Sequence, residues 1–231
     1  MTDDRNLTKE QIDFMKKMKA VASDLWGAAP KNPPAAAQNS EDGSYDAQTV
    51  NDTRAQMPAR KDALTLDNLW KTADETVDWT GALAHEQSPD GLTSPVLWRF
   101  YHRHAQRVLN GDIQAYADVL KAANPLGELT EFAESMTLRP VSAGRVECEF
   151  EAKEALTADS PKQYLAAMGL RIARDLLACL PVDEVGIRTT LHGNTIMTVT
   201  YPREKLLHRN FLFADPEKLA EECGAEMEGI I

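Results

Sequence analysis

The chain has 231 residues, of which 43% are hydrophobic and 26% charged, and its formal net charge is −11. This composition is that of an ordinary globular protein, long enough for one large domain or two small ones. The acidic balance disfavours non-specific binding to nucleic acid or to an anionic membrane surface, although it leaves room for a local basic patch.

The spacing of the cysteines and the lengths of the apolar runs indicate the cellular compartment of the protein. Cys148, Cys179 and Cys223 lie far apart in no ligand-like spacing, which argues against a disulfide framework and for a reducing environment. The first twenty residues contain no apolar signal-peptide core, and no run of about 18 apolar residues occurs along the chain. We therefore expect a cytoplasmic protein that does not engage a membrane.

The first predicted element is an amphipathic helix over Thr8–Trp26, which begins with a capping pattern at Thr8 and Gln11. Its apolar face, a candidate partner surface, consists of Phe14, Met15, Met18, Val21, Leu25 and Trp26. Residues 28–61 hold hardly any large apolar side chain, so burial cannot offset their ordering entropy. We expect residues 1–27 to form a helix tethered by a flexible linker over 28–61.

Residues 62–133 form a predicted helical region. Apolar residues recur at helical spacing from Leu64 to Leu83, and Ser94-Pro95 starts a second helix that runs to Leu109. A third, short helix follows Asp112 and ends at Asn124-Pro125.

Residues 134–231 are predicted to form an α+β domain. Alternating residues indicate two strand pairs, and a helix that starts at Ser160-Pro161 and ends before Pro181 separates them. Asp215-Pro216 begins a final short helix. The order β-β-α-β-β-α predicts a four-stranded antiparallel sheet crossed by the long helix, in an α+β protein with a helical N-terminal half. Whether residues 62–231 share one core stays open.

The most distinctive charged feature is a ridge of arginines. Arg99, Arg103 and Arg107 recur every fourth residue on one helix, with His102 beside them, and Arg209 lies in a second basic segment. Such a ridge is a candidate site for an anion or an acidic partner. A solvated face that pairs with the surplus carboxylates of the chain is the favoured alternative.

Other reactive constellations are weak. His102 and His104 lie two residues apart on a helix and point in different directions, so they do not predict a shared metal ion. Asp183-Glu184 and the alternating Glu147, Glu149 and Glu151 are typical of a solvent-facing strand surface. The chain has no nucleophile elbow, P-loop or dinucleotide-binding fingerprint. We expect no cofactor and no metal.

Four segments carry a resemblance. They are NPLGELTEF (124–132), RVECEFEAKEAL (145–156), LRIARDLLACLPVDEV (170–185) and VTYPREKLLHRNF (199–211). In this order the segments resemble the C-terminal region of some uncharacterised bacterial proteins, over about the last hundred residues. The resemblance implies a bacterial accessory domain of unknown function, and it transfers no active-site residue.

Two hypotheses follow. The first is a non-enzymatic interaction module that binds a protein partner, or itself, through the tethered helix. The second is a factor or enzyme that binds an anion or nucleic acid through Arg99, Arg103 and Arg107. The first hypothesis is favoured because no group of catalytic residues is recognisable in the sequence.

Overall fold

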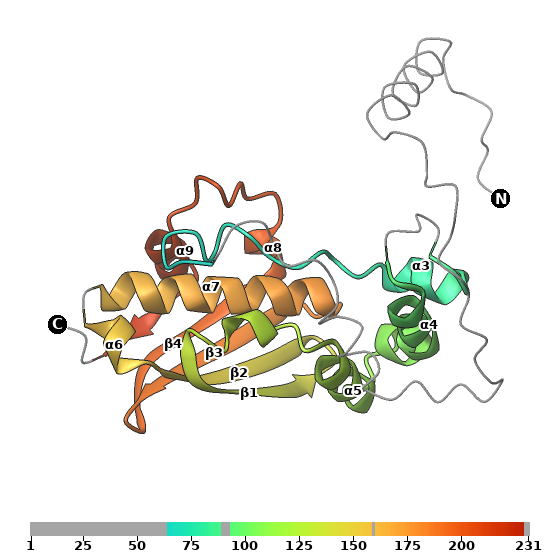
Figure 1. Cartoon of the computed structure of the whole chain (residues 1–231), viewed down its shortest axis with the longest axis horizontal. Coiled ribbons are helices and arrows are strands. Elements are labelled where there is room, and N and C mark those ends of the chain that lie inside the picture. Colours follow the sequence, from blue (N-terminus) through green and yellow to red (C-terminus); the bar gives the residue numbers. More distant parts are fainter. Residues whose placement is uncertain (1–63, 89–92, 159, 229–231) are drawn as a thin grey trace, which may run out of the picture. The chain divides into compact units, whose positions relative to one another are not determined.

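The computed structural model describes residues 64–88, 93–158 and 160–228 (Figure 1). The chain divides into two units, and all these residues belong to the second, 44–231. The predicted helix Thr8–Trp26 and the predicted linker 28–61 lie outside the described residues.

A mixed five-stranded sheet forms one layer of the fold. Its strands, in spatial order, are β1 (Ala133–Ser142), β2 (Arg145–Ala152), β3 (Glu184–Leu191), β4 (Asn194–Pro202) and β5 (Glu226–Met227). Strands β2 and β3 pair in parallel, whereas the other neighbours pair antiparallel.

The α+β class is therefore correct, but the prediction of a four-stranded antiparallel sheet is wrong. The helix between β2 and β3 returns the chain to the end where β2 began, so the next strand must run parallel to β2. The two-residue strand β5 is too short to leave an alternating pattern.

The predicted alternation on the central strands is confirmed. Val146, Cys148 and Phe150 of β2 are buried, and they share a sheet face with Val185 and Ile187 of β3. The intervening Glu147, Glu149 and Glu151 lie on the opposite face, as expected of a polar sheet surface.

The long helix α7 (Pro161–Cys179) crosses the sheet, and fifteen of its residues are buried, far more than one apolar stripe. The apolar residues that recur at helical spacing along it, Leu165, Met168, Ile172, Leu176 and Cys179, are all buried. The predicted start at Ser160-Pro161 is confirmed, although the Ser160 side chain makes no capping bond. The carbonyls at the C-terminal end of α7 accept hydrogen bonds from a residue outside the helix, because the Arg203 guanidinium donates to the Leu177 and Leu180 carbonyls.

The remaining helices surround this core. They are α3 (Trp79–Ala84), α4 (Pro95–Leu109), α5 (Ile113–Ala123), the 3-10 turn η1 (Gly127–Leu129), α6 (Glu154–Thr157), α8 (Arg203–Leu206) and α9 (Pro216–Glu222). The predicted starts at Ser94-Pro95, Asp112 and Asp215 are confirmed, although the Ser94 side chain makes no capping bond.

The predicted helix over Leu64–Leu83 is wrong. Residues 64–78 form turns and irregular backbone, and only Trp79–Ala84 is helical. The apolar residues of this segment are buried in that conformation, including Leu69 and Trp70. Tertiary packing therefore overrides the local periodicity.

Buried side chains from α4, α5, α7 and the sheet belong to one hydrophobic cluster, which extends from Leu69 to Ala220. In the part of the chain that the structure describes, no helix is both long and apolar enough to cross a membrane.

Candidate functional site

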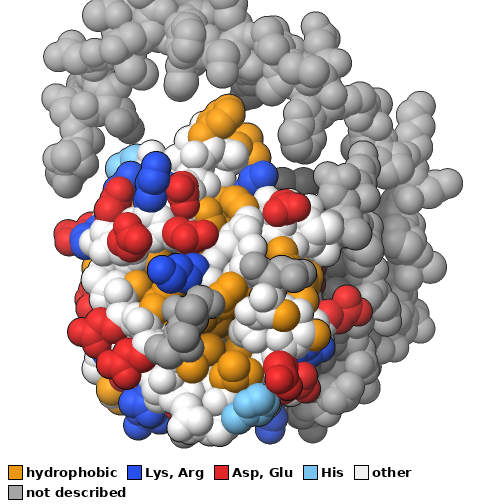
Figure 2. Space-filling model, turned by 90° about the vertical axis from the view of Figure 1, so that its left-hand side faces the viewer, with side chains coloured by type: hydrophobic (Ala, Val, Ile, Leu, Met, Phe, Trp, Pro, Cys, Tyr) orange, Lys and Arg blue, Asp and Glu red, His pale blue; other side chains and the backbone are white. Residues whose placement is uncertain are grey.

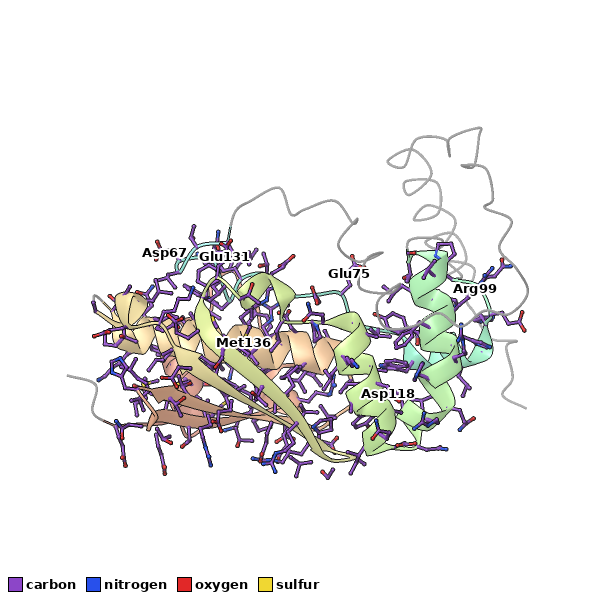
Figure 3. The ribbon with its side chains drawn as sticks, turned by 60° about the horizontal axis from the view of Figure 1, so that its bottom comes forward. Asp67, Glu75, Arg99, Asp118, Glu131 and Met136 are labelled. Carbon is purple, nitrogen blue, oxygen red and sulfur yellow. The ribbon has the colours of Figure 1, made fainter. Side chains whose placement is uncertain are left out.

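Residues 64–78, here called the arm, lie along α7. Gln163, near the start of α7, lies 3.4 Å from the Asp67 carboxylate, whereas the Val77 amide donates to the Ala178 carbonyl at 2.9 Å, near its end. The arm thus runs parallel to the helix, with Asp67 and Glu75 at different points along it (Figure 3). Because it forms no strand or helix of its own, its backbone groups need partners from α7.

Two fully buried charged residues of α7 supply those partners. Arg171 and Asp175 are both 0% exposed, and the Arg171 Nε donates to Asp175 Oδ2 at 2.6 Å. The Arg171 guanidinium also donates to the Thr72 hydroxyl at 2.9 Å, and Asp175 accepts the Asp74 amide at 2.8 Å. The pair therefore joins the middle of the arm to the centre of α7.

Burial dominates the electrostatics of this pair. Desolvation, with a further contribution from Asp74, raises the pKa of the Asp175 carboxyl to about 6, against the opposing attraction of Arg171. Arg171 has a second carboxylate partner, Glu128 of η1, at 3.2 Å. The cluster thus links α7, the arm and η1.

Residues 207–215, here called the loop, connect α8 to α9 and rest on the arm and on α7. The Trp70 indole N–H donates to the Ala214 carbonyl at 2.9 Å. The Arg174 guanidinium carbon lies 3.7 Å from the centre of the Phe211 ring, in a cation–π contact, and Arg174 also donates to the Trp70 carbonyl. The base of the loop is therefore fixed at two points.

The top of the loop holds large apolar side chains in solvent. Phe213 is 86% exposed and Leu212 is 65% exposed, and Leu207 at the start of the loop is 51% exposed. Asn210 fixes the turn between them, because its side chain accepts the Leu212 amide at 3.1 Å and its carbonyl accepts the Phe213 amide at 3.2 Å. Figure 2 shows hydrophobic side chains at the top of the described surface, where the loop rises in Figure 1. We call Leu212 and Phe213 the tip.

The charged residues near the tip are already engaged with one another. Arg209, a predicted anion-binding residue, forms an ion pair with Glu222 at 2.7 Å. The Lys205 ammonium donates to the Glu222 carbonyl, and Asp215 caps α9 by accepting two backbone amides. The exposed feature of this region is therefore apolar.

The predicted arginine ridge is only partly assembled as a site. A hollow of about 220 Å³ lies beside α4, and its lining consists of Glu86, Gln87, Arg99, His102 and Arg103. Figure 3 marks Arg99 on this helix. Arg107 does not line the hollow and instead forms ion pairs with Asp112 at 2.8 Å and with Asp118 at 3.7 Å. Arg209 belongs to the loop, and neither Asp183 nor Glu184 lines the hollow.

The histidines make separate contacts. The Nδ1 atom of His102 lies 2.6 Å from the Ala82 carbonyl, and that of His104 lies 2.9 Å from the Phe100 carbonyl. Each Nδ1 therefore carries a proton. Within residues 64–88, 93–158 and 160–228, no three His, Cys, Asp or Glu side chains gather as metal ligands. Burial raises the pKa of the Cys148 thiol to about 12, which makes this thiol a poor nucleophile.

Sequence reasoning missed both the buried pair and the tip. A signal existed for the pair, since Arg171 and Asp175 stand four residues apart, as an ion pair on one helix face would, within a largely apolar helix. A signal for the tip was the apolar run Phe211-Leu212-Phe213 between Asn210 and Asp215, in a segment that otherwise reads as a surface turn.

Comparison with protein-family models, with curated proteins and with solved structures gives no significant match to this chain.

Proposed function

We propose that this protein is a non-enzymatic, cytoplasmic interaction module that binds a protein partner, with the tip as its principal contact. The observation that carries the proposal is the exposure of Leu212 and Phe213 on a loop fixed by Trp70 and Arg174. The resemblance to the C-terminal region of uncharacterised bacterial proteins fits an accessory role, because it implies no active-site residue.

The energetics favour an apolar pocket on the partner. Burial of a Leu or Phe side chain contributes about 1.5–3 kcal/mol, and both tip residues leave most of this free energy unused in the isolated chain. The fixed base of the loop lowers the entropy cost of ordering the tip in a complex. Arg209 already has Glu222 as its partner, so the tip does not require an acidic surface.

The N-terminal helix remains part of this proposal as a second contact. Its predicted apolar face includes Phe14, Met18, Leu25 and Trp26, a pattern suited to a groove on a partner or on another copy. A tethered second contact would raise the overall affinity through effective concentration, without altering the tip.

Affinity co-purification from the source cells tests the proposal. A double variant, Leu212→Ser with Phe213→Ser, is compared with Ile113→Ser, which changes an apolar residue that is 44% exposed at the start of α5. We expect the double variant to lose the partner and to weaken binding to that partner, once purified, by about 10- to 100-fold. Retention of the same partners would contradict the role of the tip. Deletion of residues 1–60 tests the helix separately.

A second candidate function is supported by the hollow beside α4. Arg99, Arg103 and His102 line it together, so an anionic ligand or a nucleic-acid backbone would meet two guanidinium groups there. Glu86 in the same lining and the net charge of −11 oppose this function. Replacement of Arg99, Arg103 and Arg107 by Ser should abolish binding of phosphate or of an oligonucleotide if the hollow is an anion site.

A further inference from the structure

The two edges of the sheet differ in whether a short further strand covers them. At one edge β5 covers part of β4, because it pairs with Met197 and Thr198, and the Glu228 amide donates to the Ile196 carbonyl. At the other edge lies the ten-residue strand β1. Among the described residues, no backbone hydrogen bond joins β1 to any segment other than β2. An edge of this kind is a template for another strand.

The regular part of β1 offers a defined set of backbone groups. Pairing with β2 is uninterrupted from Ser135 to Pro140, between register irregularities at both ends. Proline within a sheet is placed where its missing N–H faces away from the ladder. Since outward-facing groups alternate along a strand, Met136 and Leu138 share the orientation of Pro140 and present their N–H and C=O groups outward.

The side chains of β1 show incomplete burial on the helix side of the sheet. Met136 and Leu138 are half-buried, whereas Phe150 and Cys148, their register partners on β2, are almost fully buried. Figure 3 marks Met136 on this strand. A strand added beside β1 would extend the apolar layer and cover both side chains.

We propose that β1 is a self-association edge, at which β1 of a second copy of this chain pairs antiparallel about a two-fold axis at Thr137. This register sets Met136 of each copy opposite Leu138 of the other, apolar against apolar. It also sets each Arg139 opposite Ser135, so no like charges face one another. The missing N–H of Pro140 falls outside the central pairs.

The charges of β1 are compatible with this pairing. Arg139 forms an ion pair with Glu147 of β2 at 2.5 Å, so its guanidinium is directed toward its own sheet. The two Thr137 side chains meet on the axis, on the polar face of the sheet. The proposal is independent of the tip, which lies on the loop between α8 and α9.

Sedimentation equilibrium of the full chain over a range of concentrations is the first test. We expect the mass to rise toward twice that of one chain. Thr137→Lys and Thr137→Glu should each keep the mass at that of one chain, because like charges then meet on the axis, and an equimolar mixture of the two should restore the dimer. Thr137→Val and Phe213→Ser are matched controls that should dimerise as the wild type does.

A covalent test uses Thr137→Cys in a Cys223→Ser background. Residues opposite one another in a non-hydrogen-bonded antiparallel pair have Cα atoms about 4.5 Å apart, within the range of a disulfide. We expect rapid oxidation to a cross-linked dimer, whereas Glu149→Cys, on the same polar face of the central strand β2, should stay uncross-linked. A monomeric wild type, a dimer that survives Thr137→Lys, or equal cross-linking of both cysteine variants would overturn the proposal. Circular dichroism confirms that each variant is folded.

Discussion

Replacement of Arg171 by Met tests how strongly the buried pair stabilises the fold. Met matches the aliphatic part of arginine but donates no hydrogen bond. The variant leaves the Asp175 carboxylate fully buried without the guanidinium that now lies at 2.6 Å, and it removes the hydrogen bond from Arg171 to the Thr72 hydroxyl. Removal of one member of a buried pair costs about 3–5 kcal/mol, most of it for the uncompensated charge that remains.

Urea unfolding followed by circular dichroism measures this cost. With a slope of about 2 kcal/mol per molar urea, the midpoint should fall by about 2 M. The matched control is Arg188→Met, since Arg188 pairs with Glu149 at 3.7 Å in an exposed position and should cost less than about 1 kcal/mol. The double variant Arg171→Met with Asp175→Leu should regain most of the loss. Equal costs for Arg171→Met and Arg188→Met would refute the reasoning.

Three further predictions follow from burial. The folded pKa of Asp175, about 6, exceeds its ordinary value of 3.8, so its contribution to the free energy of unfolding is full below pH 3.8 and lost as the pH rises through 6. Urea titrations between these pH values should therefore show a free energy of unfolding that falls more steeply with pH in the wild type than in Asp175→Asn. Parallel plots of the free energy of unfolding against pH would contradict this prediction. Among the described residues the buried Tyr201 hydroxyl has no hydrogen-bond partner, so Tyr201→Phe should not lower the melting temperature. Tyr116→Phe, which loses a hydrogen bond to the Ala143 carbonyl, should instead lower the free energy of unfolding by about 1 kcal/mol. Thiol reagents should label half-buried Cys223 in the folded protein and spare buried Cys148, as mass spectrometry of the labelled peptides would reveal.

The strands could be predicted from sequence because their alternation is local. Val146, Cys148 and Phe150 show it within five residues. The parallel pairing of β2 with β3 could not, because it joins strands separated by the whole of α7, and no local pattern encodes which strands become neighbours.

The arm illustrates a second limit. Its apolar spacing suits a helix, yet Arg171, Arg174 and Asp175, about a hundred positions away, bind its backbone in another conformation. Local propensity is a weak guide where distant side chains supply the hydrogen bonds. The exposure of Phe213 could not be predicted locally either, because the loop that carries it is fixed by a hydrogen bond from Trp70, far away in the sequence.

The central claim is that the tip contacts a protein partner, and site-specific photo-cross-linking in the source cells tests it most directly. A photoreactive phenylalanine analogue replaces Phe213 in one variant and Leu109, an exposed residue at the end of α4, in another. We predict a discrete adduct of one protein with the label at 213 and none of that protein with the label at 109. Identical adducts from both positions, or none from 213, would contradict the account.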